Sequence, residues 1–341
     1  MLEPSTTIAI AGAGSIGCYV GGTLALAGRR VRLLARRRIV DAVAAKGLHI
    51  ADLDGPHQRL SPSAIGASED PAKAFAGAGL VLVTVKSGDT AEMAATIARH
   101  APPDAVVVSL QNGTANPGVL SRGLAASQRA VAGMVSFNVV QGEAADGVPS
   151  FRRTTSGEVL VQADIPGLVA LLDVPGLRVE AAPDMDAVLW GKLLLNLNNA
   201  LNALSGLTLI EQFADRDWRR VMAAQIEEGL AVMRAAVIRP ARIGALSPGL
   251  LPFVLRLPDF VFHVLARRML AVDPNARPSM AQDLERGRPT EVDEFQGAII
   301  RLGEAHGVAT PLSRRVLERI RAAEAAGKGS PRLRPGDLMP R

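Results

Sequence analysis

Short apolar runs alternate with helical patterns through the first half of the chain. Five runs rich in aliphatic and β-branched residues predict strands, at residues 8–11, 31–34, 80–85, 105–108 and 130–137. Several are apolar at consecutive positions, which is typical of parallel strands buried on both faces. Segments of helical length and spacing lie between them, at 90–100 and 116–124. This alternation predicts a doubly wound α/β sheet.

The pattern changes after residue 183. Short strands at 158–162 and 177–180 are expected to extend the first sheet, but leucines then recur at helical spacing from Leu189 to Leu204. Further helices are expected at 216–238, 250–270, 280–286, 290–306 and 312–324. The sequence therefore predicts an α/β domain over 1–183 and an all-α domain over 184–326. A Pro/Gly-rich basic tail at 327–341 is expected to be disordered.

Composition narrows the class of protein. The 341 residues are 48% hydrophobic and 21% charged, which fits about two folded domains and excludes bulk disorder. A single cysteine, Cys18, excludes a disulfide framework, and the five histidines show no metal-ligand spacing, so no metal site is expected. No apolar run reaches the ~18 residues of a membrane span, and the run at 8–13 is too short for a secretory signal. We expect a soluble, cytoplasmic protein.

The positive charge is concentrated in two places. Six arginines lie between Arg29 and Arg38, and the segment 327–341 carries four cations against Asp337. The rest of the chain is nearly neutral, and aromatic residues make up only 3%. We therefore predict no nucleic-acid partner, since neither a broad basic face nor a stacking surface is indicated.

A glycine-rich turn follows the first expected strand and opens a helix. Its residues are Gly12, Ala13, Gly14, Ser15, Ile16 and Gly17. In this context the glycines permit a tight turn and a close backbone approach, and the helix N-terminus offers free N–H groups to a pyrophosphate. The alternative is a purely structural glycine-rich turn.

The end of the second strand indicates which dinucleotide binds. An acidic residue there holds the ribose 2′-hydroxyl of NAD, whereas arginine accommodates the 2′-phosphate of NADP. Here Arg36 follows the strand, and no acid appears before Asp41. The sequence favours NADP(H), although a solvated basic helix start would equally explain Arg37 and Arg38.

Lysine is rare in this chain, which draws attention to two positions. Only five of the 38 basic residues are lysines. Lys86 follows a strand at the carboxyl edge, where doubly wound sheets bind ligands, and Asn112 follows the next strand. An Asx-type turn would explain Asn112 without any function.

The other lysine lies in an apolar helical pattern. Lys192 shares one helical face with Asn196 and Asn199, which predicts a polar site on that helix. Snorkelling of the lysine and hydrogen bonds between helices are the alternatives.

Together these residues resemble the ketopantoate reductase (2-dehydropantoate 2-reductase) family over almost the whole chain. The matching motifs are GAGSIG at 12–17, VKS at 85–87, QNG at 111–113, LWGKLLLN at 189–196, RPSMAQDLERGRPTEVDEFQG at 277–297 and HGVATP at 306–311. The resemblance implies an N-terminal Rossmann domain, a helical C-terminal domain and an active site in the cleft between them. It also implies NADPH-dependent reduction of 2-dehydropantoate to (R)-pantoate, on the route to pantothenate and coenzyme A.

The resemblance assigns roles to individual residues. Lys192 matches the catalytic lysine at the substrate carbonyl, Asn196 a substrate-binding asparagine, and Ser279 the serine that binds the substrate carboxylate. Glu291 matches the glutamate near the reaction centre and cofactor, while Lys86 and Asn112 match cofactor-contacting positions. A helix N-cap for Ser279 and a solvated first-turn acid for Glu291 are the alternatives.

One position departs from the family pattern. Where the family commonly has a second substrate-side asparagine, eight residues after the lysine, this chain has Ala200, with Asn199 beside it. The segment 238–263 could also reshape the cleft. Two alternatives follow: a related reductase of another 2-oxo acid, or a non-catalytic NADPH-binding sensor. A homodimer is compatible with such a helical domain.

Overall fold

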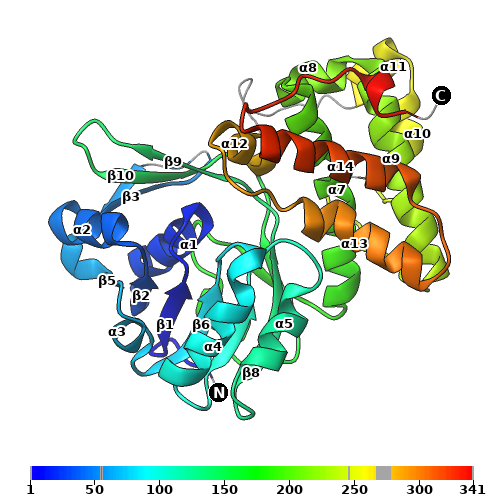
Figure 1. Ribbon diagram of the computed structural model, residues 1–341. Helices are drawn as coiled ribbons and strands as arrows, with labels where there is room; N and C mark the ends of the chain where they lie inside the picture. Colours follow the sequence, from blue (N-terminus) through cyan, green and yellow to red (C-terminus); the bar gives the residue numbers. More distant parts are fainter. Residues whose placement is uncertain (1, 54, 56, 245, 266–277, 340–341) are drawn as a thin grey trace. The chain divides into compact units, whose positions relative to one another are not determined.

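The computed structural model describes residues 2–339, apart from 54, 56, 245 and 266–277 (Figure 1). The chain divides into two compact units between Met185 and Asp186, two residues beyond the boundary expected at 183/184. Within the described residues, no helix has the length and apolar character needed to cross a bilayer.

The first unit is built on an eight-stranded sheet, in the order β12-β11-β8-β7-β6-β1-β2-β5. From β5 to β8 all neighbours are parallel, whereas β11 is antiparallel to β8 and parallel to β12. The five strands expected at the start of the chain are confirmed: the strand at 31–34 has the expected bounds, and the ends of the others differ by at most two residues. The strands are β1 (Thr7–Ala11), β2 (Val31–Leu34), β5 (Gly66–Ser68), β6 (Ala78–Val83), β7 (Val106–Ser109), β8 (Arg129–Val135), β11 (Val159–Gln162) and β12 (Val179–Ala182).

Helices cover both faces of this sheet because its central strands are apolar on both sides. Ile8 and Ile10 pack in one core with α1 (Ser15–Leu26), α2 (Arg37–Lys46) and α6 (Leu168–Leu172). Ala9 and Ala11 belong to the opposite core, with α3 (Pro71–Phe75), α4 (Thr90–His100) and α5 (Asn116–Gly123). In Figure 1, α4 (cyan) and α5 (blue-green) lie beside the strands of this sheet. The predicted doubly wound architecture is confirmed.

A second, four-stranded sheet lies against α1. Its strand order is β4-β3-β10-β9. Its strands are β3 (Leu48–Ala51), β4 (His57–Leu60), β9 (Val139–Glu143) and β10 (Pro149–Arg153). Ile50 of β3 packs against Gly22 of α1 so closely that a Cβ on Gly22 would stand 2.4 Å from Ile50 Cδ1. Of the short strands that the sequence predicts within 148–181 as extensions of the first sheet, β11 and β12 do extend it, whereas β10 pairs with β3 and β9 instead.

In its described residues the second unit contains helices and no strands, as predicted, and these helices surround one apolar core. Its helices are α7 (Met185–Ser205), α8 (Leu209–Ala214), α9 (Arg216–Ala235), α10 (Leu251–Arg256), α11 (Asp259–Leu265), α12 (Ser279–Glu285), α13 (Val292–Ala305) and α14 (Pro311–Ala326). The single helix expected at 250–270 is two helices, because Leu257 precedes Pro258 and is extended (ψ 149°). Residues 266–270 of that expectation lie outside the described residues.

The segment after α14 packs against the helical unit, in contrast to the disorder expected for 327–341. Leu338 is fully buried in the core, and its carbonyl accepts a hydrogen bond from Arg315 Nη1 at 2.6 Å. The Leu333 N–H donates to the Leu204 carbonyl at 2.9 Å. The prediction of disorder rested on the Pro/Gly-rich basic composition and overlooked these two leucines, which anchor the segment. The segment includes the short 3-10 helix η3 (Pro335–Asp337).

Candidate functional site

The glycine-rich turn between β1 and α1 depends on the absence of side chains. Gly12 has φ +97°, and a Cβ on it would stand 2.4 Å from Val85 Cγ1. A Cβ on Gly17 would stand 2.5 Å from Thr84 Oγ1 and 2.7 Å from the Gly12 carbonyl oxygen. These positions therefore require glycine for the turn itself and for close packing of α1 on the sheet.

Neighbouring strands hold the turn in place. Thr84 Oγ1 donates to the Gly12 carbonyl at 2.6 Å, and the N–H groups of Gly12 and Ala13 donate to the Leu34 carbonyl at 3.3 and 3.0 Å. Cys18 Sγ donates to the Ala13 carbonyl at 3.3 Å, and burial raises the pKa of this thiol to about 12. Cys18 thus supports the turn and is no nucleophile. Thr84 was not identified from the sequence.

The outer side of the turn is open. A Cβ on Gly14, the N-cap of α1, would meet nothing within 4 Å, and no acidic residue lies in the first turn of the helix. The N–H groups of Ser15 and Ile16 begin the helix, where backbone donors have no intrahelical acceptor. The turn therefore fits a dinucleotide pyrophosphate, with free donors, open space and no repelling carboxylate.

The arginines of the cluster 29–38 differ in their partners. Arg29, Arg30 and Arg32 donate to backbone carbonyls of Leu171, Ser5 and Ala76 respectively, so they hold loops and helix ends. Arg37 pairs with Asp41 at 3.5 Å.

Arg36 differs from these arginines. It is the exposed N-cap of α2, two residues beyond the end of β2, and within the described residues its side chain makes no hydrogen bond or ion pair. This guanidinium is therefore available to a phosphate group at the end of β2.

A buried polar network joins the loops that follow β6 and β7. Gln111 Nε2 donates to Thr90 Oγ1 at 2.7 Å and to the Val85 carbonyl at 3.1 Å. Thr90 Oγ1 donates to Asn116 Oδ1 at 2.8 Å, and Asn116 Nδ2 donates to the Asn112 carbonyl at 2.6 Å. The network fixes the backbone around Asn112 at the carboxyl edge of the sheet. Thr90 and Asn116 were missed in the sequence because no local motif marks them.

Lys86 occupies the same edge. It is exposed, and it precedes the short 3-10 helix η2 (Ser87–Asp89) as its N-cap. Asn116 Nδ2 also donates to Ser87 Oγ at 2.9 Å, so the network reaches the residue next to Lys86. The structure therefore brings the two sequence-predicted residues of this edge, Lys86 and Asn112, onto loops that share one network.

The polar stripe of α7 lies on a continuous helix. Lys192, Asn196 and Asn199 follow the i, i+4, i+7 spacing that places them on one face. Lys192 and Asn199 are partly exposed, while Asn196 is 8% exposed. Burial lowers the pKa of Lys192 from 10.5 to about 8, because desolvation disfavours the ammonium form.

The segment after α9 packs beside this lysine. The Ala241 N–H donates to the Ala187 carbonyl of α7 at 2.8 Å. A Cβ on Gly191 would stand only 2.3 Å from the Ala241 carbonyl oxygen. The glycine that precedes Lys192 thus lets another backbone segment lie against α7, where it helps to exclude water from the helix surface.

The four asparagines of α7 are used differently. Asn198 and Asn202 donate to Gln212 Oε1 of α8 at 3.3 and 2.9 Å, which holds the two helices together. Asn196 is buried, yet its Nδ2 has no hydrogen-bond partner among the described residues. An unpaired buried amide is costly unless a ligand uses it, so Asn196 is the one of these asparagines that suits substrate binding.

Ser279 and Glu291 stand at the starts of two other helices. Ser279 is the exposed first residue of α12, and Pro278 occupies the N-cap position, so Ser279 does not cap this helix. Glu291 is the partly buried N-cap residue of α13, and its side chain makes no capping hydrogen bond. The structural alternatives for both residues are therefore weakened. Lys192, Asn196, Asn199, Ser279 and Glu291 all belong to the helical unit, and the glycine-rich turn, Arg36, Lys86 and Asn112 to the first.

Ala200 lies in the helical core. It is fully buried among leucines, whereas the adjacent Asn199 is partly exposed. An amide at position 199 therefore points to a different side of α7 from one at position 200.

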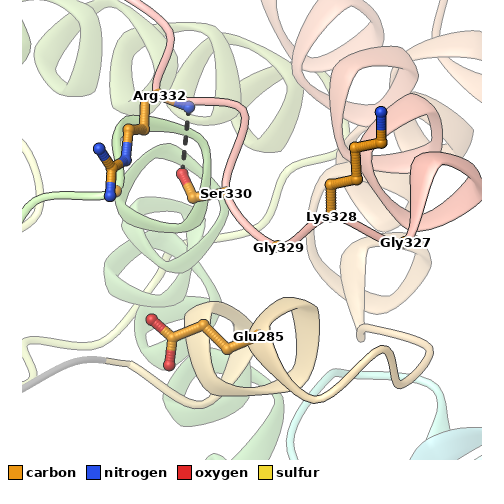
Figure 2. A pocket seen from close by; sticks show the side chains of 7 residues that line it. Glu285, Gly327, Lys328, Gly329, Ser330 and Arg332 are labelled. Atoms are coloured by element: carbon orange, nitrogen blue, oxygen red, sulfur yellow. Dashed lines mark hydrogen bonds between the residues drawn. The ribbon is translucent and has the colours of Figure 1, made fainter.

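A polar hollow elsewhere in the helical unit contains none of these residues. Figure 2 shows it, with Lys328 pointing away from Glu285 and Ser330 Oγ accepting a hydrogen bond from the Arg332 N–H at 3.3 Å. Its volume is about 560 Å³, and its lining also includes Gly206, Gly327 and Gly329. Its charged side chains are all exposed, and we assign it no role in the chemistry.

Known proteins resemble the chain along its length. Residues 8–162 match the family described as ketopantoate reductase PanE/ApbA, and residues 184–324 match the C-terminal part of that family. A 2-dehydropantoate 2-reductase of Archaeoglobus fulgidus is 29% identical over 331 residues, which cover 93% of this chain and 98% of that protein. A PanE/ApbA family ketopantoate reductase from Ralstonia eutropha JMP134 has a crystal structure with a TM-score of 0.78 and 31% identity, covering 95% of this chain and 100% of that one. D-mandelate dehydrogenase, solved with NADH and anilino(oxo)acetate, shares the fold with a TM-score of 0.75 at 21% identity, covering 94% and 99% of the two chains.

Proposed function

The chain belongs to the ketopantoate reductase family of oxidoreductases, and from this premise we propose that it reduces 2-dehydropantoate to (R)-pantoate with NADPH. The observation that carries the proposal is the pair on α7: a partly buried lysine with a lowered pKa, one helical turn before a buried amide without a partner. A ketone with an adjacent carboxylate offers such a pair one oxygen that develops negative charge and further acceptors for hydrogen bonds.

The residues of the first unit would hold the cofactor. The backbone of Gly12 to Gly17 would bind the pyrophosphate, Arg36 the 2′-phosphate, and Lys86 and Asn112 the nicotinamide end. When bound, the cofactor supplies the hydride for the substrate ketone. NADPH is favoured over NADH by Arg36 and by the absence of an acid at the end of β2.

Residues of the helical unit would direct the substrate chemistry. Lys192, as an ammonium, stabilises the developing oxyanion and gives its proton to the alkoxide. Asn196 donates from the unpaired Nδ2 to the substrate, and Ser279 binds the carboxylate. Glu291 carries a carboxylate at the start of α13, and its motif resembles that of the family's glutamate near the reaction centre and cofactor. Asn199 adds an amide to the same face as Lys192.

Ala200 supports a second candidate, reduction of a different 2-oxo acid. The methyl group cannot donate or accept a hydrogen bond, so a substrate hydroxyl that needs an amide at this position would be left unpaired. The reaction type is unchanged in this alternative, because it depends on Lys192 and not on position 200.

The test is oxidation of NADPH, followed at 340 nm, with 2-dehydropantoate and a panel of other 2-oxo acids. Turnover with 2-dehydropantoate far above the others is the expected result. Preference for another acid would favour the second candidate. No turnover across the panel, with NADPH still bound in a titration, would contradict both and favour a non-catalytic sensor.

A further inference from the structure

A glutamine of α13 reaches the helix that carries the catalytic candidates. Gln296 is fully buried, and its Nε2 donates to the backbone carbonyl of Leu197 at 3.0 Å across 99 residues of sequence. Leu197 directly follows Asn196 and lies just over one turn beyond Lys192. Gln296 lies in the second turn of α13, the helix that Glu291 precedes as N-cap.

The surrounding contacts between α7, α9 and α13 are apolar. A Cβ on Gly229 of α9 would stand 2.8 Å from Leu194 Cδ2 of α7 and 3.4 Å from Ile299 Cδ1 of α13, so the three helices converge closely here. Apolar packing holds helices together but is not directional, and neighbouring arrangements bury similar areas. A buried hydrogen bond to one chosen carbonyl is satisfied in only one arrangement.

We propose that Gln296 is a positioning residue. Its hydrogen bond fixes the position of α7 along its axis relative to α13, and so the placement of Lys192 and Asn196 relative to Glu291. The inference rests on the proposed function, since it concerns the same catalytic group. A displacement of about 1 Å in a catalytic constellation can cost on the order of a hundredfold in rate, so one hydrogen bond can affect turnover more than stability.

The chain provides a matched control. Gln225 of α9 is also fully buried in the same unit, but neither its Nε2 nor its Oε1 has a partner among the described residues. Gln296→Met and Gln225→Met therefore make the same chemical change in similar surroundings. Only the first removes a hydrogen bond to α7.

We expect Gln296→Met to lower kcat about tenfold or more, with the Kd for NADPH unchanged and a melting temperature within a few degrees of Gln225→Met. The upper limb of its kcat–pH profile should also shift, because a displaced α7 changes the burial of Lys192. Gln225→Met should keep the wild-type kcat and profile. If the two variants share the same kcat and pH profile, the inference is wrong.

A second substitution keeps the test decisive if Gln296→Met does not fold. Gln296→Glu preserves shape, and its carboxyl group can donate to Leu197 only while protonated. Its kcat should therefore approach the wild-type value at low pH and fall as the carboxyl ionises; a wild-type profile throughout would overturn the proposal. Failure of the proposed function is recognised separately, by a Lys192→Met variant that retains full turnover.

Discussion

The two units differ in whether their buried polar side-chain atoms have hydrogen-bond partners. In the described part of the first unit, every buried side-chain nitrogen and oxygen has a partner, as the network around Gln111 illustrates. In the helical unit eight such atoms have none, on Asn196, Asn202, Arg216, Gln225, Gln296, Thr310 and Ser313. Each unpaired group costs about 1–3 kcal/mol, so the helical unit carries polarity that its own stability does not need.

One of these eight atoms, Asn196 Nδ2, belongs to the proposed substrate site, and there the difference bears on how each unit would recognise its ligand. The turn at Gly12–Gly17 presents backbone N–H groups, which exist in any chain that can adopt the conformation. Side chains around the turn only have to hold it, and they satisfy one another. In the helical unit the proposed recognising groups are side chains, and Lys192 is desolvated while Asn196 Nδ2 is unpaired in the protein alone. A site built from side chains is thus less stable than one built from backbone.

The largest expected effect comes from removing the desolvated amine. Lys192→Met should lower kcat by about 10²–10⁴, because both oxyanion stabilisation and proton donation are lost. The Kd for NADPH should stay within a few-fold of wild type, since the turn, Arg36, Lys86 and Asn112, which we propose bind the cofactor, belong to the other unit. Stopped-flow turnover and fluorescence titration measure the two quantities.

The stability of the same variant provides its control. The lowered pKa of Lys192 means that below pH 8 the folded protein holds a charge it disfavours, so Lys192→Met should be at least as stable as wild type. Exposed Lys328 is the matched lysine, and Lys328→Met should leave kcat unchanged. A Lys192→Met protein that melts well below wild type would show that the lysine has a structural role instead.

Substitutions in the C-terminal segment test how much its apolar burial contributes to the stability of the helical unit, which carries the unpaired polar groups. Leu338→Ala removes a fully buried side chain from the core and should destabilise this unit by about 2–5 kcal/mol. Met339→Ala, at a 38% exposed position, is the neighbouring control and should cost far less. Urea denaturation measures both. Equal midpoints would mean that the segment is not anchored as described.

A smaller effect is expected at the cofactor end. Arg36→Ala should weaken NADPH binding about 10- to 100-fold and leave NADH binding nearly unchanged, because only the 2′-phosphate is affected. Arg37→Ala is the control, since Arg37 already pairs with Asp41. Dissociation constants for both nucleotides decide the result. An equal loss for NADPH and NADH would remove Arg36 from the 2′-phosphate site.

The sequence predicted the parts of the molecule that repeat a local rule. The parallel strands, the glycine turn and the α7 stripe each follow from spacing along a short stretch of chain. What it missed depends on partners far away in the sequence. β10 pairs with β3 although about a hundred residues separate them. Leu338 is buried in the core although it lies in a Pro/Gly-rich basic segment whose composition is typical of disorder. The hydrogen bond from Gln296 to Leu197 belongs to the same class, because no local pattern marks either residue as its partner.

The roles of single side chains were even less accessible from local pattern. Among the four asparagines of α7, spacing alone groups Asn196 with Asn199. It does not show that the other two, Asn198 and Asn202, donate hydrogen bonds to Gln212. Only the packing of α8 against α7 separates Asn198 and Asn202, whose Nδ2 groups bind Gln212, from Asn196, whose Nδ2 has no partner among the described residues.

A pH dependence, which needs no substitution, tests whether burial of Lys192 serves the reaction. An ammonium with its pKa lowered to about 8 donates its proton at neutral pH, so kcat for reduction should be flat below pH 8 and fall about tenfold per pH unit above it. Oxidation of the hydroxy acid needs the free amine as base, so its kcat should rise through the same range. Opposite slopes around one pKa would identify a single group acting in both directions. If reduction stayed flat to pH 10, the amine would not be the proton donor, and its burial would be only a by-product of packing Ala241 against Gly191.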